Sequence, residues 1–381
     1  MNKLLPLLFS PLLVLFSCAG TATTDTRDWT MLPFMKADAV NPVLTPGTGT
    51  FFCPIRQEKV AWEVKDVFNP ALVVHQGKIM MLYRAEDSVG KYAGTSRIGL
   101  AESDDGLHFT RHPEPVFFPD NDDQKIYEWE GGCEDPRLVQ AETGEFIMTY
   151  TAYDGDKARL MIASSPDLRQ WTKHGPAFST VPGDPYTGKW SKSGAIVATY
   201  EEDGRIRATR IKNKYWMYWG DVNIMAATSD DLIHWTPVEY ADSSQYPSTF
   251  HRNSEELKAV RQVFGPRPGK FDSDLVEPGP AARLTDKGIL LIYNSRNLAE
   301  GDSTLAEGTY TVAQVLLDRD DPMKVLNRMD TWFLKPDKPF ETEGQVNQVC
   351  FAEGLVYFQN KWFLYYGTAD SKIGVAVKEG Y

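Results

Sequence analysis

The sequence has no block of Lys and Arg residues. Its 40 basic and 52 acidic residues are interspersed and give a formal net charge of −12. Such a chain is a poor partner for a nucleic-acid backbone or an anionic membrane surface. A P-loop, a glycine-rich dinucleotide turn and a Ser-His-Asp order are also absent from the sequence. We therefore expect no nucleic-acid partner and no organic cofactor.

Long hydrophobic runs are missing as well, apart from residues 4–16. This run is too short, and too often interrupted by proline, to cross a membrane as a helix. Because Lys3 gives it a positive start, it is typical of a secretory signal peptide, which we assign to residues 1–17. It ends in Leu15-Phe16-Ser17-Cys18, which resembles a bacterial lipobox. The alternative is an ordinary signal peptide with an accidental cysteine.

A lipobox makes Cys18 the lipidated N-terminus of the mature protein. Residues 18–28 then form a tether, and residues 29–381 form the folded domain. We expect an exported bacterial lipoprotein, in the periplasm or at the cell surface, that is anchored to the outer membrane through this lipid alone. The sequence does not indicate its oligomeric state.

Cysteine is scarce, with four residues in a chain of 381. Without Cys18, the odd number that remains argues against a disulfide framework in an exported protein. The spacing of Cys53, Cys133 and Cys350 fits no zinc site. We expect these three thiols to be buried small side chains, and we expect no bound metal ion.

A turn followed by an aromatic-rich strand occurs five times. Counted from positions 78, 145, 214, 288 and 361, the intervals are 67, 69, 74 and 73 residues, and an aromatic residue stands five places after each position. Short apolar runs bounded by Gly or Asn turns are typical of strands rather than helices. The predicted strands are residues 78–83, 145–150, 214–219, 288–293 and 361–366.

Further strands accompany each copy, one before it and one after it, and three copies close with a Ser-Asp turn. About four strands in each of five units predict an all-β fold, a five-bladed β-propeller that spans residues 29–381. A pair of β-sandwiches or a solenoid is the alternative, although solenoid repeats of roughly 20–50 residues are shorter than these. The polar stretch 240–270 is expected to be a long excursion between units three and four, with a short helix at 254–263.

The first strand of each unit is expected to line the central channel. These strands begin with polar residues that should gather at one mouth of the axis, namely Asn69, Asp135, Ser193, Glu277 and Asn347. Asp135 and Glu277 come from units two and four, and they would face each other across the mouth. Two facing carboxylates are what inverting glycoside hydrolysis needs, because one protonates the leaving oxygen and the other activates water. The alternative that Asp135 pairs with Arg137 and has a purely structural role stays open.

A second ring of polar residues follows the aromatic strands. Carboxylate, amide and guanidinium groups beside an aromatic platform are suited to holding a substrate rich in hydroxyl groups. The members of this ring are Arg84, Glu86, Asp87, Asp154, Asp221, Asn294, Arg296 and Asp370.

Several motifs spread over about residues 60–378 are similar to those of glycoside hydrolase family 130. They are Phe68-Asn-Pro-Ala71, Tyr83-Arg-Ala-Glu-Asp87, Ser96-Arg-Ile-Gly99, Gly132-Cys-Glu-Asp-Pro-Arg137, Glu277-Pro-Gly-Pro280 and Tyr366-Gly-Thr-Ala-Asp370. The resemblance implies a five-bladed propeller that acts on β-mannosides, either as a phosphorylase or as a hydrolase. It also implies that Asp135 donates a proton through a sugar hydroxyl, and that Asn69, Arg84, Asp87 and Asp370 hold the mannose.

Departures from the phosphorylases of the family favour the hydrolase branch, which is similar to exported β-1,2-mannosidases. Those phosphorylases have small residues where Glu277 stands, and they have phosphate-binding basic residues where Tyr293-Asn-Ser295 and Tyr218-Trp-Gly-Asp221 stand. An added carboxylate repels phosphate and can activate water. Glu277 is therefore the expected base, with Asp221 assisting, although Asp221 stands where the resemblance leads us to expect Glu.

The resulting prediction is an inverting exo-β-mannosidase that releases mannose from non-reducing ends of β-mannoside oligosaccharides, with β-1,2 as the expected linkage. One alternative is a phosphorylase that produces mannose 1-phosphate, with Arg137, Lys192 and Arg296 supplying charge. Arg137 and Lys192, together with Asn294, are counted as candidate substrate-binding residues. A second alternative is a glycan-binding lipoprotein without catalysis. The second sugar is expected to contact loops such as 112–130 and 181–191.

Overall fold

The computed structural model describes residues 28–92, 94–248 and 254–380. The predicted signal peptide at 1–17, the lipidation site Cys18 and the tether up to residue 27 lie outside the described residues. Within the described part, no helix is long and apolar enough to cross a membrane. Cys53, Cys133 and Cys350 are free and buried, which confirms the expectation for these thiols.

The described residues form a nearly all-β, propeller-like fold in which antiparallel strands follow one another in groups. The first three groups follow the first three sequence repeats. The first group is β4 (Asp66–His75), β5 (Lys78–Glu86), β6 (Ser96–Ser103) and β7 (Thr110–Arg111), and the second is β8 (Gly132–Gln140), β9 (Phe146–Tyr153), β10 (Ala158–Ser165) and β11 (Thr172–Pro176). The third group is β12 (Ala195–Tyr200), β14 (Tyr215–Trp219), β15 (Ile224–Ser229) and β16 (Trp235–Pro237). In this third group β13 (Ile206–Ala208) also pairs with β12, and β17 (Gln262–Phe264) pairs with β15.

The remaining strands form two more antiparallel groups and one separate hairpin. The fourth group is β18 (Leu275–Pro278), β19 (Ala282–Thr285), β20 (Gly288–Arg296), β21 (Tyr310–Leu317) and β22 (Val325–Arg328). The fifth group is β23 (Cys350–Phe358), β24 (Lys361–Thr368), β25 (Lys372–Glu379) and β1 (Met35–Lys36). The hairpin consists of β2 (Thr50–Cys53) and β3 (Glu58–Ala61). Helices are short, namely α1 (Lys125–Glu128), α2 (Pro339–Thr342) and the 3₁₀ turns η1 (Ser243–Gln245) and η2 (Ser254–Leu257).

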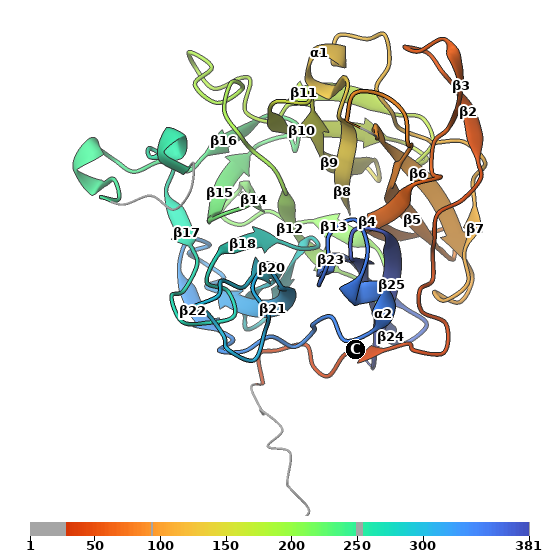
Figure 1. The fold of residues 1–381 in the computed structure, drawn as a ribbon. Coiled ribbons are helices and arrows are strands. Elements are labelled where there is room, and N and C mark those ends of the chain that lie inside the picture. The colour runs from red at the N-terminus through yellow and green to blue at the C-terminus, as the bar shows by residue number, and fades with distance from the viewer. Residues whose placement is uncertain (1–27, 93, 249–253, 381) are drawn as a thin grey trace, which may run out of the picture.

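The groups stand around a central region, and the first strand of each lies nearest to it (Figure 1). Pairing between the start and the end of the described chain closes the arrangement, because β1 joins β25 with Met35 opposite Val377. The Gln314 side chain adds a second tie, since it accepts the Met31 N–H at 2.8 Å and donates to the Met31 carbonyl at 3.1 Å. The N-terminal segment is therefore held against two groups that come last in the sequence.

All five predicted aromatic strands are confirmed as β5, β9, β14, β20 and β24. Two other expectations need correction. A single inner strand was expected in each unit, but in the fourth group it breaks into β18 and β19 around Gly279-Pro280. Pro278 and Pro280 have no N–H to donate to a neighbouring strand. The helix expected at 254–263 is only the 3₁₀ turn η2, followed by β17.

The aromatic residue at the end of each repeat is almost fully buried, at 1% exposure or less. In four groups it is a tyrosine whose hydroxyl donates to a buried carboxylate, and a basic side chain contacts the same carboxylate. We call these the Tyr–carboxylate pairs. They are Tyr83–Glu63 with Arg111, Tyr150–Glu128 with Lys173, Tyr293–Asp272 with Arg328, and Tyr366–Glu341 with Lys36. In the third group the residue is Trp219, and its indole Nε1 has no hydrogen-bond partner among the described residues.

Candidate active site

The backbone turns left-handed at the start of four of the inner strands. The φ angle is +47° at Asn69, +48° at Asp135, +59° at Ser193 and +62° at Gln348. This conformation is uncommon outside glycine, and at Asn69 and Asp135 it coincides with a β-bulge in β4 and β8. The bulge re-aims the side chain towards the axis. In the fifth group Gln348 takes this position instead of the expected Asn347, whose amide oxygen accepts a hydrogen bond within its own turn.

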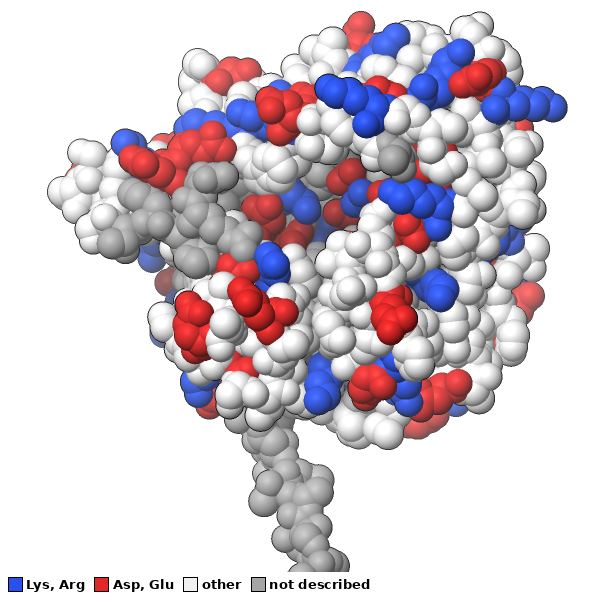
Figure 2. Space-filling view, viewed as in Figure 1, with Lys and Arg blue, Asp and Glu red and all other residues white. Residues whose placement is uncertain are grey.

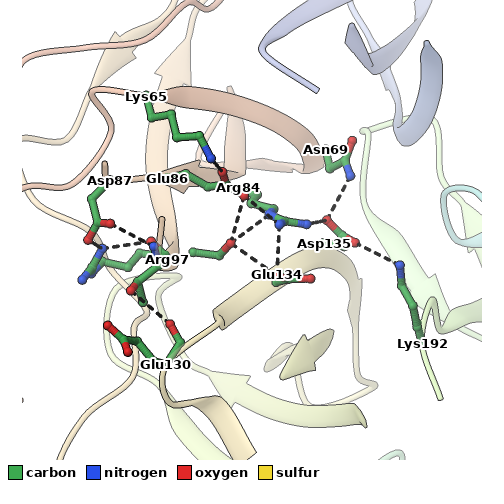
Figure 3. Close-up of polar contacts among 12 residues, drawn as sticks. Lys65, Asn69, Arg84, Glu86, Asp87, Arg97, Glu130, Glu134, Asp135 and Lys192 are labelled. Atoms are coloured by element: carbon green, nitrogen blue, oxygen red, sulfur yellow. Dashed lines mark hydrogen bonds and ion pairs between the residues drawn. The ribbon is translucent and has the colours of Figure 1, made fainter. Parts of the chain in front are cut away.

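One face of the molecule is hollowed, and charged side chains line the hollow (Figure 2). Asp135 lies at the centre of a polar cluster that includes Asn69, Arg84 and Lys192 (Figure 3). Its Oδ1 accepts a hydrogen bond from Asn69 Nδ2 at 2.9 Å and from Arg84 Nη1 at 3.1 Å. Its Oδ2 lies 3.9 Å from Lys192 Nζ (Figure 3). Only 3% of Asp135 is exposed. Three of the predicted site residues therefore converge on the predicted acid.

Glu277, which is also buried, lies on the side of Lys192 opposite Asp135. Its Oε1 accepts a short hydrogen bond from the Ser193 hydroxyl and lies 3.7 Å from Lys192 Nζ. Asp135 Oδ2 and Glu277 Oε1 are thus at most 7.6 Å apart, which is 3.9 Å plus 3.7 Å. This upper limit is compatible with the separation of about 6.5–9.5 Å between the two carboxyl groups of inverting glycosidases, and also with the shorter separation of about 5–5.5 Å in retaining ones.

The protonation of the cluster follows from burial and from its cations. Burial alone would raise the pKa of Asp135, but Arg84 and Lys192 outweigh it and lower this pKa to about 2. Burial raises the pKa of the neighbouring Glu134 to about 7, against the opposing effect of Arg84, whose Nη2 is 3.0 Å away. Between them, Glu134 and Asp135 therefore keep one proton up to about pH 7.

On the opposite side of the site, the surroundings of Glu277 shift its pKa in the direction that a general base requires. Burial raises the pKa of Glu277 above its ordinary value, Lys192 opposes this shift and Asp221 adds to it. Burial alone would lower the pKa of Lys192, but Glu277 and Asp135 raise it above its ordinary value. Lys192 is therefore a permanent cation between the two carboxylates. Burial also raises the pKa of Asp370 to about 7, although Arg84 acts against it.

Asp221 lies at the edge of the cluster. Its Oδ2 accepts a hydrogen bond from the indole Nε1 of Trp190 at 2.7 Å, and its charge acts on Lys192 and Glu277. Trp190 lies in the loop that was expected to contact the second sugar. Asp221 is thus held beside Glu277 by an aromatic residue that is itself partly exposed.

Three predicted substrate-binding residues have their polar atoms engaged within the protein. Asp87 pairs with Arg97 at 2.6 Å and accepts two backbone N–H groups, on the side of Arg84 away from Asp135 (Figure 3). The Asn294 amide exchanges two hydrogen bonds with the Ala352 backbone. The third is Arg137, which donates to the carbonyls of Asp135, Pro278 and Gly279 and pairs with Glu353 at 2.9 Å.

Sequence reasoning missed several buried groups of the site. Glu134 precedes Asp135 and shares Arg84 with it, and its only signal was its place within the Glu-Asp-Pro-Arg motif. Glu353 projects from a bulge in β23 and is 2% exposed. Burial raises its pKa well above the ordinary value, against the effect of Arg137. No sequence pattern indicated that Glu353 would face a residue more than 200 positions earlier.

A metal centre finds no support in the described ranges. No three His, Cys, Asp or Glu side chains there are grouped so that they could hold a metal ion. The chemistry of the described site is that of carboxylates, amides and fixed cations.

Comparisons with known proteins identify the family of this chain. A family model for glycoside hydrolase family 130, described as β-1,4-mannooligosaccharide phosphorylase, matches residues 41–379. A 1,2-β-oligomannan phosphorylase from Thermoanaerobacter sp. (strain X514) is 29% identical, over 84% of this chain and 91% of that protein. A β-1,2-mannobiose phosphorylase from the same strain is 28% identical, over 86% and 93%.

Solved structures are more similar still. A glycosyl hydrolase from Bacteroides ovatus is 43% identical, with a TM-score of 0.85, over 92% of this chain and 95% of that one. Another structure was solved in work stating that this family of mannoside phosphorylases contains glycoside hydrolases that target β-1,2 mannosidic linkages in Candida mannan. It is 44% identical, with a TM-score of 0.85, over 92% of this chain and 95% of that one. The chain therefore belongs to glycoside hydrolase family 130, a family of enzymes that process β-mannosides.

Proposed function

We propose that this protein is an inverting exo-β-mannosidase that hydrolyses β-1,2-linked mannose from non-reducing ends. The observation that carries the proposal is the second buried carboxylate, Glu277, held by Lys192 at 3.7 Å within 7.6 Å of Asp135. Two carboxylates can act as acid and base on opposite faces of one sugar ring when about 6.5–9.5 Å separates them, and the upper limit found here allows this separation. The same five groups of strands are proposed to be the five blades of a propeller around this site.

Asp135 supplies the acid. The proton that the Glu134–Asp135 pair retains up to about pH 7 rests on Glu134, because the pKa of Glu134 is raised to about 7 and that of Asp135 is lowered to about 2. Asp135 therefore acts as the acid once this proton has passed to it. Asn69, Arg84 and Asp370 surround Asp135 and hold the mannose hydroxyls. The proton passes from Asp135 through a sugar hydroxyl to the glycosidic oxygen, which leaves with the rest of the substrate.

Glu277 supplies the base. Its pKa is raised by burial but opposed by Lys192, which suits a carboxylate that must accept a proton near neutral pH. The Ser193 hydroxyl fixes the orientation of the carboxylate. Water attacks the anomeric carbon while Glu277 takes one of its protons, so the products are mannose and the shortened glycan.

Water rather than phosphate is the proposed attacking group because the basic residues are already occupied. Arg137 pairs with the buried Glu353, and Arg296 lies 3.3 Å from Asp274. Lys192 lies between the two catalytic carboxylates. A phosphate dianion at this position would be repelled by Glu277. The β-1,2 linkage is proposed from the description of the 44%-identical structure.

Incubation with β-1,2-mannobiose, with and without phosphate, tests the proposal. Mannose should form at the same rate in both, and proton NMR should show the α-anomer first, as inversion requires. Glu277→Gln should lower kcat by at least about 1,000-fold, while the matched surface change Glu202→Gln leaves it unchanged, because Glu202 is exposed. Mannose 1-phosphate formed only with phosphate would show a phosphorylase instead. Binding without turnover by the unaltered protein would show a glycan-binding protein.

A further inference from the structure

The inner strands run from the site to the opposite face of the molecule. β4 passes Asn69 and ends at His75, and β8 carries Asp135 near its start and ends at Gln140. The ends of these two strands line a hollow together with the turn after β12 and the end of β23. We call this end of the inner strands the distal face, and the end with Asp135 and Glu277 the catalytic mouth.

The first described residue of the chain lies at the distal face. Asp28 Oδ2 is 2.8 Å from the ammonium group of Lys287, which also donates to the Asp28 carbonyl. Lys287 stands in the turn between β19 and β20. Because β19 runs parallel to the inner strand β12, with Ala282 opposite Val197, this turn lies at the same end of the fold as the end of β12.

Buried contacts fix the position at which the chain enters the fold. An exposed ion pair such as Asp28–Lys287 contributes little to stability, so it does not hold the chain alone. Trp29 packs against both hydrophobic clusters of the core. Met31 is buried, and its backbone exchanges two hydrogen bonds with the buried Gln314 side chain. The chain therefore enters the fold beside β21 at a defined place (Figure 1).

The catalytic mouth lies well above this place. Glu277 pairs with Asn294 in β20, and Asn294 comes six residues after Gly288, the first residue of that strand. Six residues of strand rise about 20 Å. Glu277 is buried, so other parts of the protein stand above it. The rim of the mouth is therefore more than about 20 Å from the level of Asp28.

The predicted lipidation site, Cys18, comes ten residues before Asp28. Ten residues span at most about 36 Å when they are fully extended. If the mouth faced the membrane, this segment would have to climb more than about 20 Å and then clear the rim, which would leave few of its conformations available. If the distal face faced the membrane, no such climb would be required.

We propose that Cys18 carries the lipid of a membrane anchor, and that this anchor holds the distal face toward the membrane and the catalytic mouth away from it. The partner surface is a lipid bilayer, and the described residues nearest to it are those around Asp28 and Lys287. The mouth stays open to a substrate too large to enter between the enzyme and the membrane. The inference depends on lipidation at Cys18, and not on whether the enzyme transfers mannose to water or to phosphate.

Energy transfer from the protein to labelled lipids tests the orientation. The full chain is produced in a host that lipidates bacterial lipoproteins, and it is reconstituted into phosphatidylethanolamine–phosphatidylglycerol vesicles with an acceptor dye on the headgroups. The donor dye is attached through Thr143→Cys, in the distal turn after β8, or through Ser88→Cys, at the mouth end of β5. Both positions are exposed and belong to neighbouring groups. Cys53, Cys133 and Cys350 are buried and do not compete for the dye.

The two labels differ in height by roughly 25 Å, which is the rise of β5 from Lys78 to Glu86. Because energy transfer falls steeply with distance, transfer from Thr143→Cys should be at least about twofold more efficient than transfer from Ser88→Cys. The same labelled proteins produced from Ala19 onward lack the predicted signal peptide and Cys18. These controls, whose folding a thermal melt verifies, should show no transfer.

Four results would overturn the proposal. They are the absence of a lipid on Cys18 in mass spectrometry, transfer that persists in the chains produced from Ala19 onward, equal transfer from both labels, and greater transfer from Ser88→Cys. The proposed function is tested separately, by the products formed with and without phosphate. A phosphorylase result with greater transfer from Thr143→Cys would refute the hydrolytic function and still support the orientation.

Discussion

Arg137 connects the acid side of the site to the base side. It donates to the backbone carbonyl of Asp135 at 3.1 Å and to the carbonyls of Pro278 and Gly279, which directly follow Glu277, at 2.8 and 2.9 Å. Its side chain is 2% exposed. We expect Arg137 to fix the distance between the two catalytic carboxylates instead of touching the sugar, which makes it a positioning residue.

The cost of Arg137→Met follows from these contacts. The change leaves Glu353 and three carbonyls without their donor, and breaking a buried ion pair costs about 3–5 kcal/mol. Glu353 can become neutral because burial already raises its pKa, so the lower end, about 3 kcal/mol, is expected. With an unfolding entropy of about 2.1 cal/mol/K per residue over roughly 350 residues, the melting temperature should fall by about 4 °C.

Activity should fall much more steeply than stability. A displacement of about 1 Å between reacting groups can cost about 100-fold in rate, so kcat of Arg137→Met should drop about 100-fold while KM changes less than threefold. The assay is steady-state release of mannose from β-1,2-mannobiose at a temperature where the variant is folded. Glu353→Gln and the double variant complete a cycle in which the two changes should be strongly non-additive in unfolding free energy.

Two outcomes would refute this reasoning. If kcat is unchanged and only the melting temperature falls, Arg137 is a structural residue without influence on the catalytic distance. If KM rises strongly at constant kcat, Arg137 contacts the substrate, as the sequence predicted, and its backbone contacts do not define its function.

Three further predictions concern titration and turns. Burial raises the pKa of Asp370 to about 7, so the stability that this residue contributes is present below its unfolded pKa and is lost as the pH rises through about 7. In thermal melts, Asp370→Asn should therefore gain stability relative to the parent from pH 5 to pH 8. A constant difference between the two proteins would contradict this. In the pH profile of kcat/KM, the apparent pKa on the acid side should lie above the ordinary glutamate pKa, because Glu277 must ionise before it can act as the base. An apparent pKa below about 4.3 would exclude Glu277 as the base. Ser229→Ala removes the acceptor of two turn N–H groups and should cost about 1–2 kcal/mol in urea unfolding without altering kcat.

The strands could be predicted because their signal is local. Each aromatic strand is a short apolar run between turns, and its position depends on its own residues alone. The Ser-Asp turns are equally local, and Ser103, Ser165 and Ser229 all accept backbone N–H groups of their own turns. The two errors have a physical cause. Prolines interrupt β18 and β19, and a favourable Glu-Glu start at 255–256 does not guarantee a helix where no buried face sustains it.

The site was less predictable because it depends on geometry between distant strands. Asp135 and Glu277 could be paired from the repeat, since equivalent positions in different units must face one axis. A shift of one residue separated Asn347 from Gln348, because the left-handed backbone conformation falls at Gln348 and the strand pattern does not reveal it. Asp87 and Asn294 lie in the right segments, yet their partners Arg97 and Ala352 could not be identified from spacing.

The Tyr–carboxylate pairs show how a repeat can indicate function by its exception. Glu63, Glu128, Asp272 and Glu341 lie 20 to 25 residues before their tyrosines, so no short motif links them. Once the pairs are known, the third group stands out because Trp219 replaces the tyrosine and keeps an unpaired donor. Four equivalent positions satisfy their buried polar atoms internally, and at the fifth the Trp219 Nε1 has no partner among the described residues. This exception stands two residues before Asp221, so the repeated packing changes in the same strand end that carries a residue of the site.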